Sequence, residues 1–115
     1  MLPHDTRKLL DDIQYATEMV QDITRSLGFA DYQAQATTRL AVERLLITIG
    51  EAIGQLVRLN PELADRITEC HRIVNLRHRL VHGYSDISHD LIWDVVETRL
   101  DRLLAEVRHL LANSP

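Results

Sequence analysis

Apolar residues recur every three or four positions along the first quarter of the chain, which is the spacing that one face of an α-helix requires. The residues in this pattern are Leu9, Ile13, Ala16, Val20, Ile23 and Leu27. Asp5 is a residue type that commonly caps helix N-termini, and Gly28 is one that commonly ends helices. The pattern therefore predicts an amphipathic first helix that Asp5 caps and Gly28 stops.

A second helical pattern runs from Asp31 to Leu59 and is apolar over a wider arc, which predicts contact with more than one neighbour. Because a glycine inside a helix costs about 1 kcal/mol relative to alanine, Gly50 and Gly54, one turn apart, predict a close helix crossing. The remaining side of this helix is a narrow polar stripe of Arg44, Thr48, Glu51, Gln55 and Arg58.

Two further helical stretches follow. Asn60 is expected to cap the third stretch, with Pro61 at its first helical position, and a break is expected near Asp65 before the helix continues to about Val81. After a short loop, Ser88 is expected to cap the last helix. The apolar face of that helix comprises Ile92, Val96, Leu100, Leu103, Val107 and Leu110. The whole pattern predicts an all-α fold, an antiparallel bundle of four main helices.

Composition narrows the class of protein. The chain has 115 residues, 45% hydrophobic and 26% charged, which is an ordinary balance for one globular domain spanning 1–115. The one cysteine, Cys70, excludes an internal disulfide and a multi-cysteine zinc site. No apolar leader or membrane-length apolar run is present, so we expect a soluble, cytoplasmic protein. The formal net charge of −4 argues against a general nucleic-acid coat but permits a local basic pocket.

The stretch RHRLVHGY at 77–84 concentrates basic and aromatic residues without an acid. On a helix with 100° per residue, one polar stripe would contain His71, Asn75, His78 and His82. Arg77 falls instead on the apolar side of that helix. An arginine that faces a core needs an anionic partner. We expect either a bound phosphate or a carboxylate of this chain, with Glu51 preferred to Glu43. The alternative for Glu51 is an ion pair with Arg44 or Arg58 on its own helix.

Three interpretations of this stretch remain open. The first is a solvated face with one arginine that extends its charged end to water. The second is a metal site, because His78 and His82 have the i, i+4 spacing of helical ligands, although Arg77 and Arg79 beside them would repel a cation. The third is phosphate chemistry on RNA, in which histidine transfers a proton and arginine stabilises the phosphorane. Arg77 and His82 point about 140° apart on an ideal helix. They converge in one chain only if that helix unwinds near its end, and a symmetric dimer would bring two sets into one cleft.

The sequence Arg77-x4-His82-Gly83-Tyr84 resembles the R-x4-H-x-Y signature of HEPN-domain proteins, and in particular their HepT-like branch. Further segments resemble the same family in the same order along the chain: 43–56, 60–63 and 80–100. The resemblance covers roughly residues 5–110 and extends well beyond the short motif.

The resemblance implies an all-helical homodimer whose motif residues line a cleft between the protomers. HepT-like proteins are metal-independent endoribonucleases that act as toxins in type VII HEPN/MNT toxin–antitoxin pairs. Their antitoxin, an MntA-like minimal nucleotidyltransferase, transfers AMP onto the motif tyrosine and silences the toxin. Carried over to this chain, Arg77 and His82 would be catalytic and Tyr84 would be the modified residue.

Further residues are expected to support contacts to RNA or its phosphates: His78, Arg79 and Glu51. The family often has Asn after the motif arginine, where this chain has His78. No metal and no other cofactor is expected, and the expected partners are an RNA substrate, the antitoxin and a second copy of the chain. The alternative is a non-catalytic HEPN module that binds a nucleotidyltransferase or a nucleotide.

Overall fold

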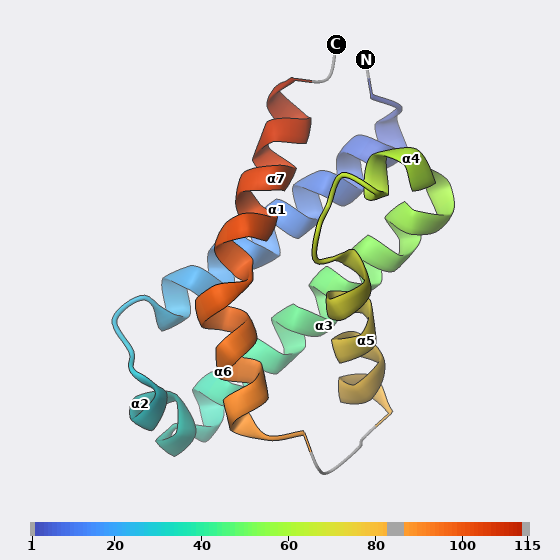
Figure 1. Cartoon of the computed structure of the whole chain (residues 1–115). Coiled ribbons are helices and arrows are strands. Elements are labelled where there is room, and N and C mark those ends of the chain that lie inside the picture. Colours follow the sequence, from blue (N-terminus) through green and yellow to red (C-terminus); the bar gives the residue numbers. More distant parts are fainter. Residues whose placement is uncertain (1, 83–86, 114–115) are drawn as a thin grey trace.

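The amphipathic patterns form seven helices and no strand over the residues that the computed structural model describes, 2–82 and 87–113 (Figure 1). In chain order the helices are α1 (His4–Thr24), α2 (Phe29–Ala34), α3 (Ala36–Leu59), α4 (Pro61–Ala64), α5 (Cys70–Val81), α6 (His89–Thr98) and α7 (Leu100–Ala112). The four predicted stretches correspond to α1, to α2 with α3, to α4 with α5, and to α6 with α7. The all-α prediction is therefore confirmed.

Helix α3 occupies the centre of the bundle and packs against α1 on one side and α5 on another, while α7 packs on α1 (Figure 1). The buried residues of α3 are Val42, Leu46, Ile49, Gly50, Ala52, Ile53 and Leu56. These contacts confirm that the wide apolar arc has more than one neighbour. Both neighbours belong to the same chain, so the arc by itself does not require a second copy.

The first two predicted helix ends are wrong. Helix α1 begins at His4, so Asp5 is not its cap but lies in its first turn, where the helix dipole favours a carboxylate. The helix ends at Thr24, before Gly28. Gly28 instead precedes α2, and its backbone N–H donates to the Asp31 carboxylate at 3.0 Å.

The long second helix was also predicted without the break that the structure contains. Gln35 has an extended backbone (φ −106°, ψ 96°) and separates α2 from α3. The separate α2 places Tyr32 in the core, fully buried, with its ring 5.2 Å from that of Trp93 on α6. Burial and then the Glu43 carboxylate raise the pKa of Tyr32 to about 12, against a smaller opposing effect of Arg39.

Two predicted caps are confirmed. The Asn60 side chain accepts a hydrogen bond from the Leu63 N–H at 3.3 Å, and the Ser88 hydroxyl accepts one from the Leu91 N–H at 3.2 Å. The expected break near Asp65 is present, because α4 ends at Ala64 and α5 begins at Cys70. No helix in the described part of the chain has both the length and the apolar character that crossing a membrane requires.

The last predicted helix is interrupted at Arg99, which divides it into α6 and α7. The Arg99 guanidinium lies 3.5 Å from the buried Glu69 carboxylate, which also lies 3.3 Å from Arg72. Nearby, Glu106 on α7 accepts hydrogen bonds from the backbone and hydroxyl of Thr68. These contacts attach the segment before α5 to the α6–α7 junction.

The predicted close crossing of helices occurs at Gly50 and not at Gly54. A Cβ placed on Gly50 would lie 2.3 Å from the Arg77 Cβ and 3.2 Å from the Ile73 carbonyl oxygen. At Gly54 the same test meets only Arg58 of its own helix, at 3.9 Å. The two glycines are one helical turn apart and cannot be told apart in the sequence, but only Gly50 lies within contact distance of α5.

Gly50→Ala should therefore separate α3 from α5. We expect it to lower the free energy of unfolding by about 2 kcal/mol, because overpacking outweighs the gain in helix propensity. Gly54→Ala is the matched control and should raise that free energy by up to about 1 kcal/mol. Urea denaturation measures both, and a Gly50→Ala protein as stable as wild type would contradict the close crossing.

Candidate active site

Helix α5 carries most of the motif that the sequence singled out. It ends at Val81, and the His82 backbone N–H donates to the His78 carbonyl oxygen at 3.1 Å. Gly83 and Tyr84 lie outside the described residues. The predicted polar stripe is confirmed, because its members are all exposed: His71, Asn75, His78 and His82.

Two histidines of this stripe lie in contact. The imidazole rings of His78 and His82 have centroids 4.3 Å apart and are inclined by 53°. Imidazole side chains can serve as general acids or bases, so two such groups lie side by side on the surface here. Within the described residues, no group of three or more histidine, cysteine or acidic side chains is arranged to hold a metal ion.

Arg77 points to the other side of α5, toward α3, and its stem packs over Gly50. Its guanidinium lies 3.5 Å from a Glu51 carboxylate oxygen, which confirms the predicted counter-charge. The Arg77 and Glu51 side chains are 34% and 43% exposed, so a pair this long contributes at most about 1 kcal/mol. The Arg77 Nε is buried and has no hydrogen-bond partner among the described residues. Contacts with Gly50 and Glu51 thus position Arg77, while its Nε–H donor makes no hydrogen bond with the described residues.

The structure does not bring the two catalytic candidates of one chain together. Arg77 contacts α3 and Glu51, whereas His82 contacts His78 on the exposed stripe. Because α5 remains helical through Val81, the angle of about 140° expected between Arg77 and His82 is largely retained. One chain therefore presents an arginine and a histidine on different faces of the same helix.

Arg79 lies on a third side of α5. It lines a cavity of about 400 Å³ between α5 and α6. The other residues of that cavity are Arg72, Asn75, Leu76, Leu91 and Val95. Arg79 is therefore separated from the Arg77–Glu51 pair by the body of the helix.

Cys70 begins α5 and has a structural role. The thiol is buried and donates to the Ala64 carbonyl oxygen at 3.4 Å. Burial, followed by the carboxylates of Asp65 and Glu106, raises the pKa of Cys70 to about 11. A buried thiol with so high a pKa is a poor nucleophile, so Cys70 is a packing residue.

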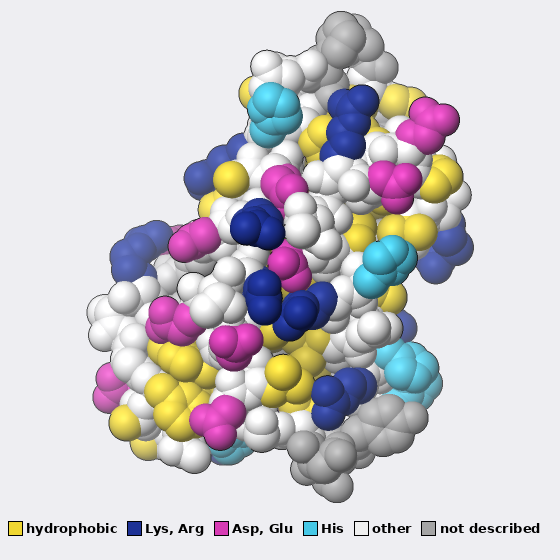
Figure 2. All heavy atoms as spheres, in the orientation of Figure 1, with side chains coloured by type: hydrophobic (Ala, Val, Ile, Leu, Met, Phe, Trp, Pro, Cys, Tyr) yellow, Lys and Arg dark blue, Asp and Glu magenta, His cyan; other side chains and the backbone are white. Residues whose placement is uncertain are grey.

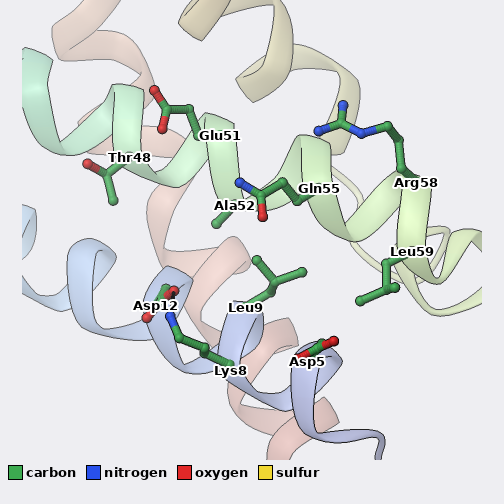
Figure 3. Close-up of a pocket in the computed structure, with 10 residues that line it drawn as sticks. All are labelled: Asp5, Lys8, Leu9, Asp12, Thr48, Glu51, Ala52, Gln55, Arg58 and Leu59. Carbon is green, nitrogen blue, oxygen red and sulfur yellow. Dashed lines mark hydrogen bonds and ion pairs between the residues drawn. The ribbon is translucent and has the colours of Figure 1, made fainter.

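A cavity of about 290 Å³ opens beside Arg77 on the surface of α3. Its lining residues are Gly50, Glu51, Gly54, Gln55, Arg58, Val74 and Arg77. A larger cavity of about 650 Å³ between α1 and α3 shares Glu51, Gln55 and Arg58 with it (Figure 3). The sequence placed Gln55 and Arg58 on a polar stripe and offered Arg58 only as an alternative ion-pair partner of Glu51, which the structure pairs with Arg77 instead. Gln55 and Arg58 lie four and seven residues after Glu51, which places all three on one side of a helix. This spacing could have indicated that they line the same site as Glu51.

The charge distribution limits where an anion can bind. On the face drawn in Figure 2, Lys and Arg side chains are interspersed with Asp and Glu side chains. This mixture agrees with the net charge of −4 and gives no broad basic surface on that face. On that face, any attraction for a phosphate would therefore have to be local.

Comparison with known proteins assigns the chain to a family. A family model described as ribonuclease HepT-like matches residues 13–110. The chain belongs to the HepT-like ribonuclease family. A relative from Thermococcus cleftensis with the name "Probable ribonuclease HepT" is 30% identical over 105 residues, covering 88% of this chain and 91% of the relative.

Two further relatives come from Methanocaldococcus jannaschii, and both are named as candidate RNases. One is 30% identical over 112 residues, covering 93% of this chain and 88% of the relative. The other is 27% identical over 109 residues, covering 93% of this chain and 97% of the relative. No solved structure is significantly similar to the chain.

Proposed function

We propose that this protein is a metal-independent endoribonuclease and the toxin of a type VII HEPN/MNT toxin–antitoxin pair, with one HEPN domain over residues 1–115. The observation that carries the proposal is the state of Arg77 in a HepT-like chain. Its guanidinium lines an open cavity, and among the described residues it forms one long, partly exposed ion pair, with Glu51. A phosphate can replace such a partner, because hydrogen bonds to charged groups contribute about 1.5–3 kcal/mol each.

In the proposed reaction, the ribose 2′-hydroxyl attacks the adjacent phosphorus and the bond from phosphorus to the 5′-oxygen breaks. His82 takes the proton of the attacking hydroxyl as a neutral imidazole. A protonated imidazole, for which His78 is placed beside it, gives a proton to the leaving 5′-oxygen. Arg77 stabilises the charge on the phosphorane, and the products carry 2′,3′-cyclic phosphate and 5′-hydroxyl ends.

The proposed active unit is a homodimer with a composite site. Because Arg77 and His82 of one chain face different directions, a two-fold axis near α5 would bring the arginine of one protomer to the histidine of the other. Val81, 43% exposed beside His82, offers apolar surface for such a contact. Arg79 would contact RNA at the edge of this cleft.

RNA cleavage should persist in excess EDTA, because the proposed chemistry uses only side chains.

Arg77→Ala and His82→Ala should each reduce the rate by about 10²-fold or more, and Arg77→Lys should fail as well because lysine lacks the planar fork. Gel analysis of cleaved RNA measures the rates, and circular dichroism checks that the variants fold. Activity lost to chelator and restored by a divalent metal would refute this mechanism. Complete inactivity of the unmodified protein would favour the non-catalytic HEPN module.

The composite site predicts a dimer that can be complemented. Light scattering should give about 26 kDa, twice the chain mass of 13.2 kDa. Mixing inactive Arg77→Ala with inactive His82→Ala should restore part of the activity, because the mixed dimer has one site with both residues. Mixtures that remain inactive despite subunit exchange, or a monomer at micromolar concentration, would contradict a shared site.

Tyr84 is the proposed site of regulation by an MntA-like antitoxin. AMP attached to its hydroxyl would place a negative charge and a base next to the motif, where it would occupy an arginine and obstruct RNA. Co-expression with the nucleotidyltransferase should increase the mass of the Tyr84 peptide by AMP units and lower the RNase activity. Tyr84→Phe should escape both effects. Equal neutralisation of wild type and Tyr84→Phe, with AMP on neither, would show inhibition by binding alone.

A further inference from the structure

Gly54 has no packing reason to be glycine. It lies inside the 24-residue helix α3, where glycine is unfavourable. A Cβ at this position would meet open space except for the Arg58 guanidinium at 3.9 Å. Gly54 lines the cavity of about 290 Å³ beside Arg77. The missing side chain therefore widens that cavity at the cost of helix stability.

Among the described residues, Arg58 is the cation lining these two cavities that forms no ion pair. Arg77 is paired with Glu51 at 3.5 Å, and Lys8, at the far side of the larger cavity, is paired with Asp12 at 3.2 Å. No described residue forms an ion pair or side-chain hydrogen bond with Arg58. Figure 3 shows its guanidinium directed away from α1 and from Lys8. An unpaired planar guanidinium at the wall of a cavity is suited to an anion that accepts two hydrogen bonds.

The two arginines lie in series along one groove. Glu51, Gln55 and Arg58 occupy one stripe of α3, and Arg77 reaches the Glu51 end of that stripe. Seven residues separate Glu51 from Arg58, which is about 10 Å along the helix axis. Gln55, between them, lines both cavities and offers an amide donor and acceptor. Across the larger cavity, on α1, lie two carboxylates, Asp5 opposite the Leu59 end of α3 and Asp12 opposite the Thr48 end (Figure 3).

We infer that this groove is a subsite for the RNA nucleotide next to the cleaved bond, with Arg58 holding the neighbouring phosphate. Gly54 leaves room for the strand, and Gln55 faces the sugar and base between the two phosphates. Asp5, on the α1 wall opposite the Leu59 end of α3, disfavours a further phosphate on that side of the larger cavity. The inference rests on the proposed RNA cleavage and assigns Arg58 to substrate positioning rather than to the chemical step.

Arg58→Gln tests the subsite, with Arg44→Gln as its matched control. Arg44 is an exposed arginine of the same helix, seven residues from Glu51 in the opposite direction, and it lines neither cavity. On a single-stranded oligoribonucleotide, Arg58→Gln should lower kcat/KM about tenfold or more, and Arg44→Gln should leave it unchanged. On a dinucleotide with a single phosphodiester, all three proteins should be equally active, because the flanking phosphate is absent. A loss that is equal on both substrates, or none on either, overturns the subsite.

Gly54→Ala supplies a second, independent measurement. The substitution should raise the midpoint of thermal unfolding and yet lower kcat/KM on the oligoribonucleotide, because its methyl group narrows the groove. Unchanged kcat/KM in a more stable Gly54→Ala protein would show that the groove is not a path for RNA.

RNA binding separates failure of the subsite from failure of the proposed function. Fluorescence anisotropy of a labelled oligoribonucleotide with His82→Ala measures binding without cleavage. Adding Arg58→Gln to this protein should weaken binding and lower the salt slope by about 0.7, the value for one phosphate of a single strand. If wild type cleaves no RNA but Arg58→Gln still weakens binding in this way, the RNase proposal fails, and the groove is an RNA phosphate site with no cleaved bond beside it. If wild type cleaves RNA and Arg58→Gln changes neither binding nor the salt slope, only the subsite fails.

Discussion

The contact of Arg77 with Gly50 positions everything else at this site. Because Gly50 has no side chain, α5 approaches α3 closely enough for the arginine stem to lie directly on the α3 backbone. The guanidinium then extends along the surface of α3 to Glu51. A larger residue at position 50 would push α5 outward and rotate or lift the arginine from the groove. The same crossing determines which sides of α5 face solvent, α6 and α3.

Electrostatic energies explain why the arrangement is poised for an anion. Arg77 is partly buried and has therefore lost part of its hydration. Within the described residues, the long ion pair with Glu51 compensates for that loss only weakly, and the Arg77 Nε has no hydrogen-bond partner. The half-exposed pair with Glu51 contributes at most about 1 kcal/mol, less than one or two charged hydrogen bonds to a phosphate. In a chain of net charge −4, a phosphate in this small groove would meet two arginines and one carboxylate, Glu51, so the proposed attraction would be confined to the groove.

The start of α5 is also fixed by contacts with other helices. Glu69 is buried between Arg72 and Arg99, and Thr68 is bonded to Glu106 on α7. These contacts tie the entry of α5 to the α6–α7 junction, while the crossing at Gly50 ties its middle to α3. The helix is thereby fixed about its own axis, and the His78–His82 pair is kept on the exposed side at its C-terminal end.

Features that depend on local spacing could be predicted from the order of the residues. Periodicity of three and four residues located the helical stretches, and side-chain chemistry next to the backbone located the caps Asn60 and Ser88. The apolar surroundings of Arg77 implied an anionic partner, and Glu51 was available on a polar stripe. The motif and its surroundings also indicated the family.

Features that depend on contacts between residues distant in the chain are visible only in the folded structure. The breaks at Gln35 and Arg99 accompany the packing of Tyr32 on Trp93 and the pairing of Arg99 with Glu69, neither of which local propensity can register. Gly50 and Gly54 are equivalent in any helical pattern, and they differ only because α5 crosses α3 at one of them. The groove that joins Arg77 to Arg58 likewise exists only once that crossing has brought the two helices together, because a cavity is a property of surfaces that the chain order does not contain.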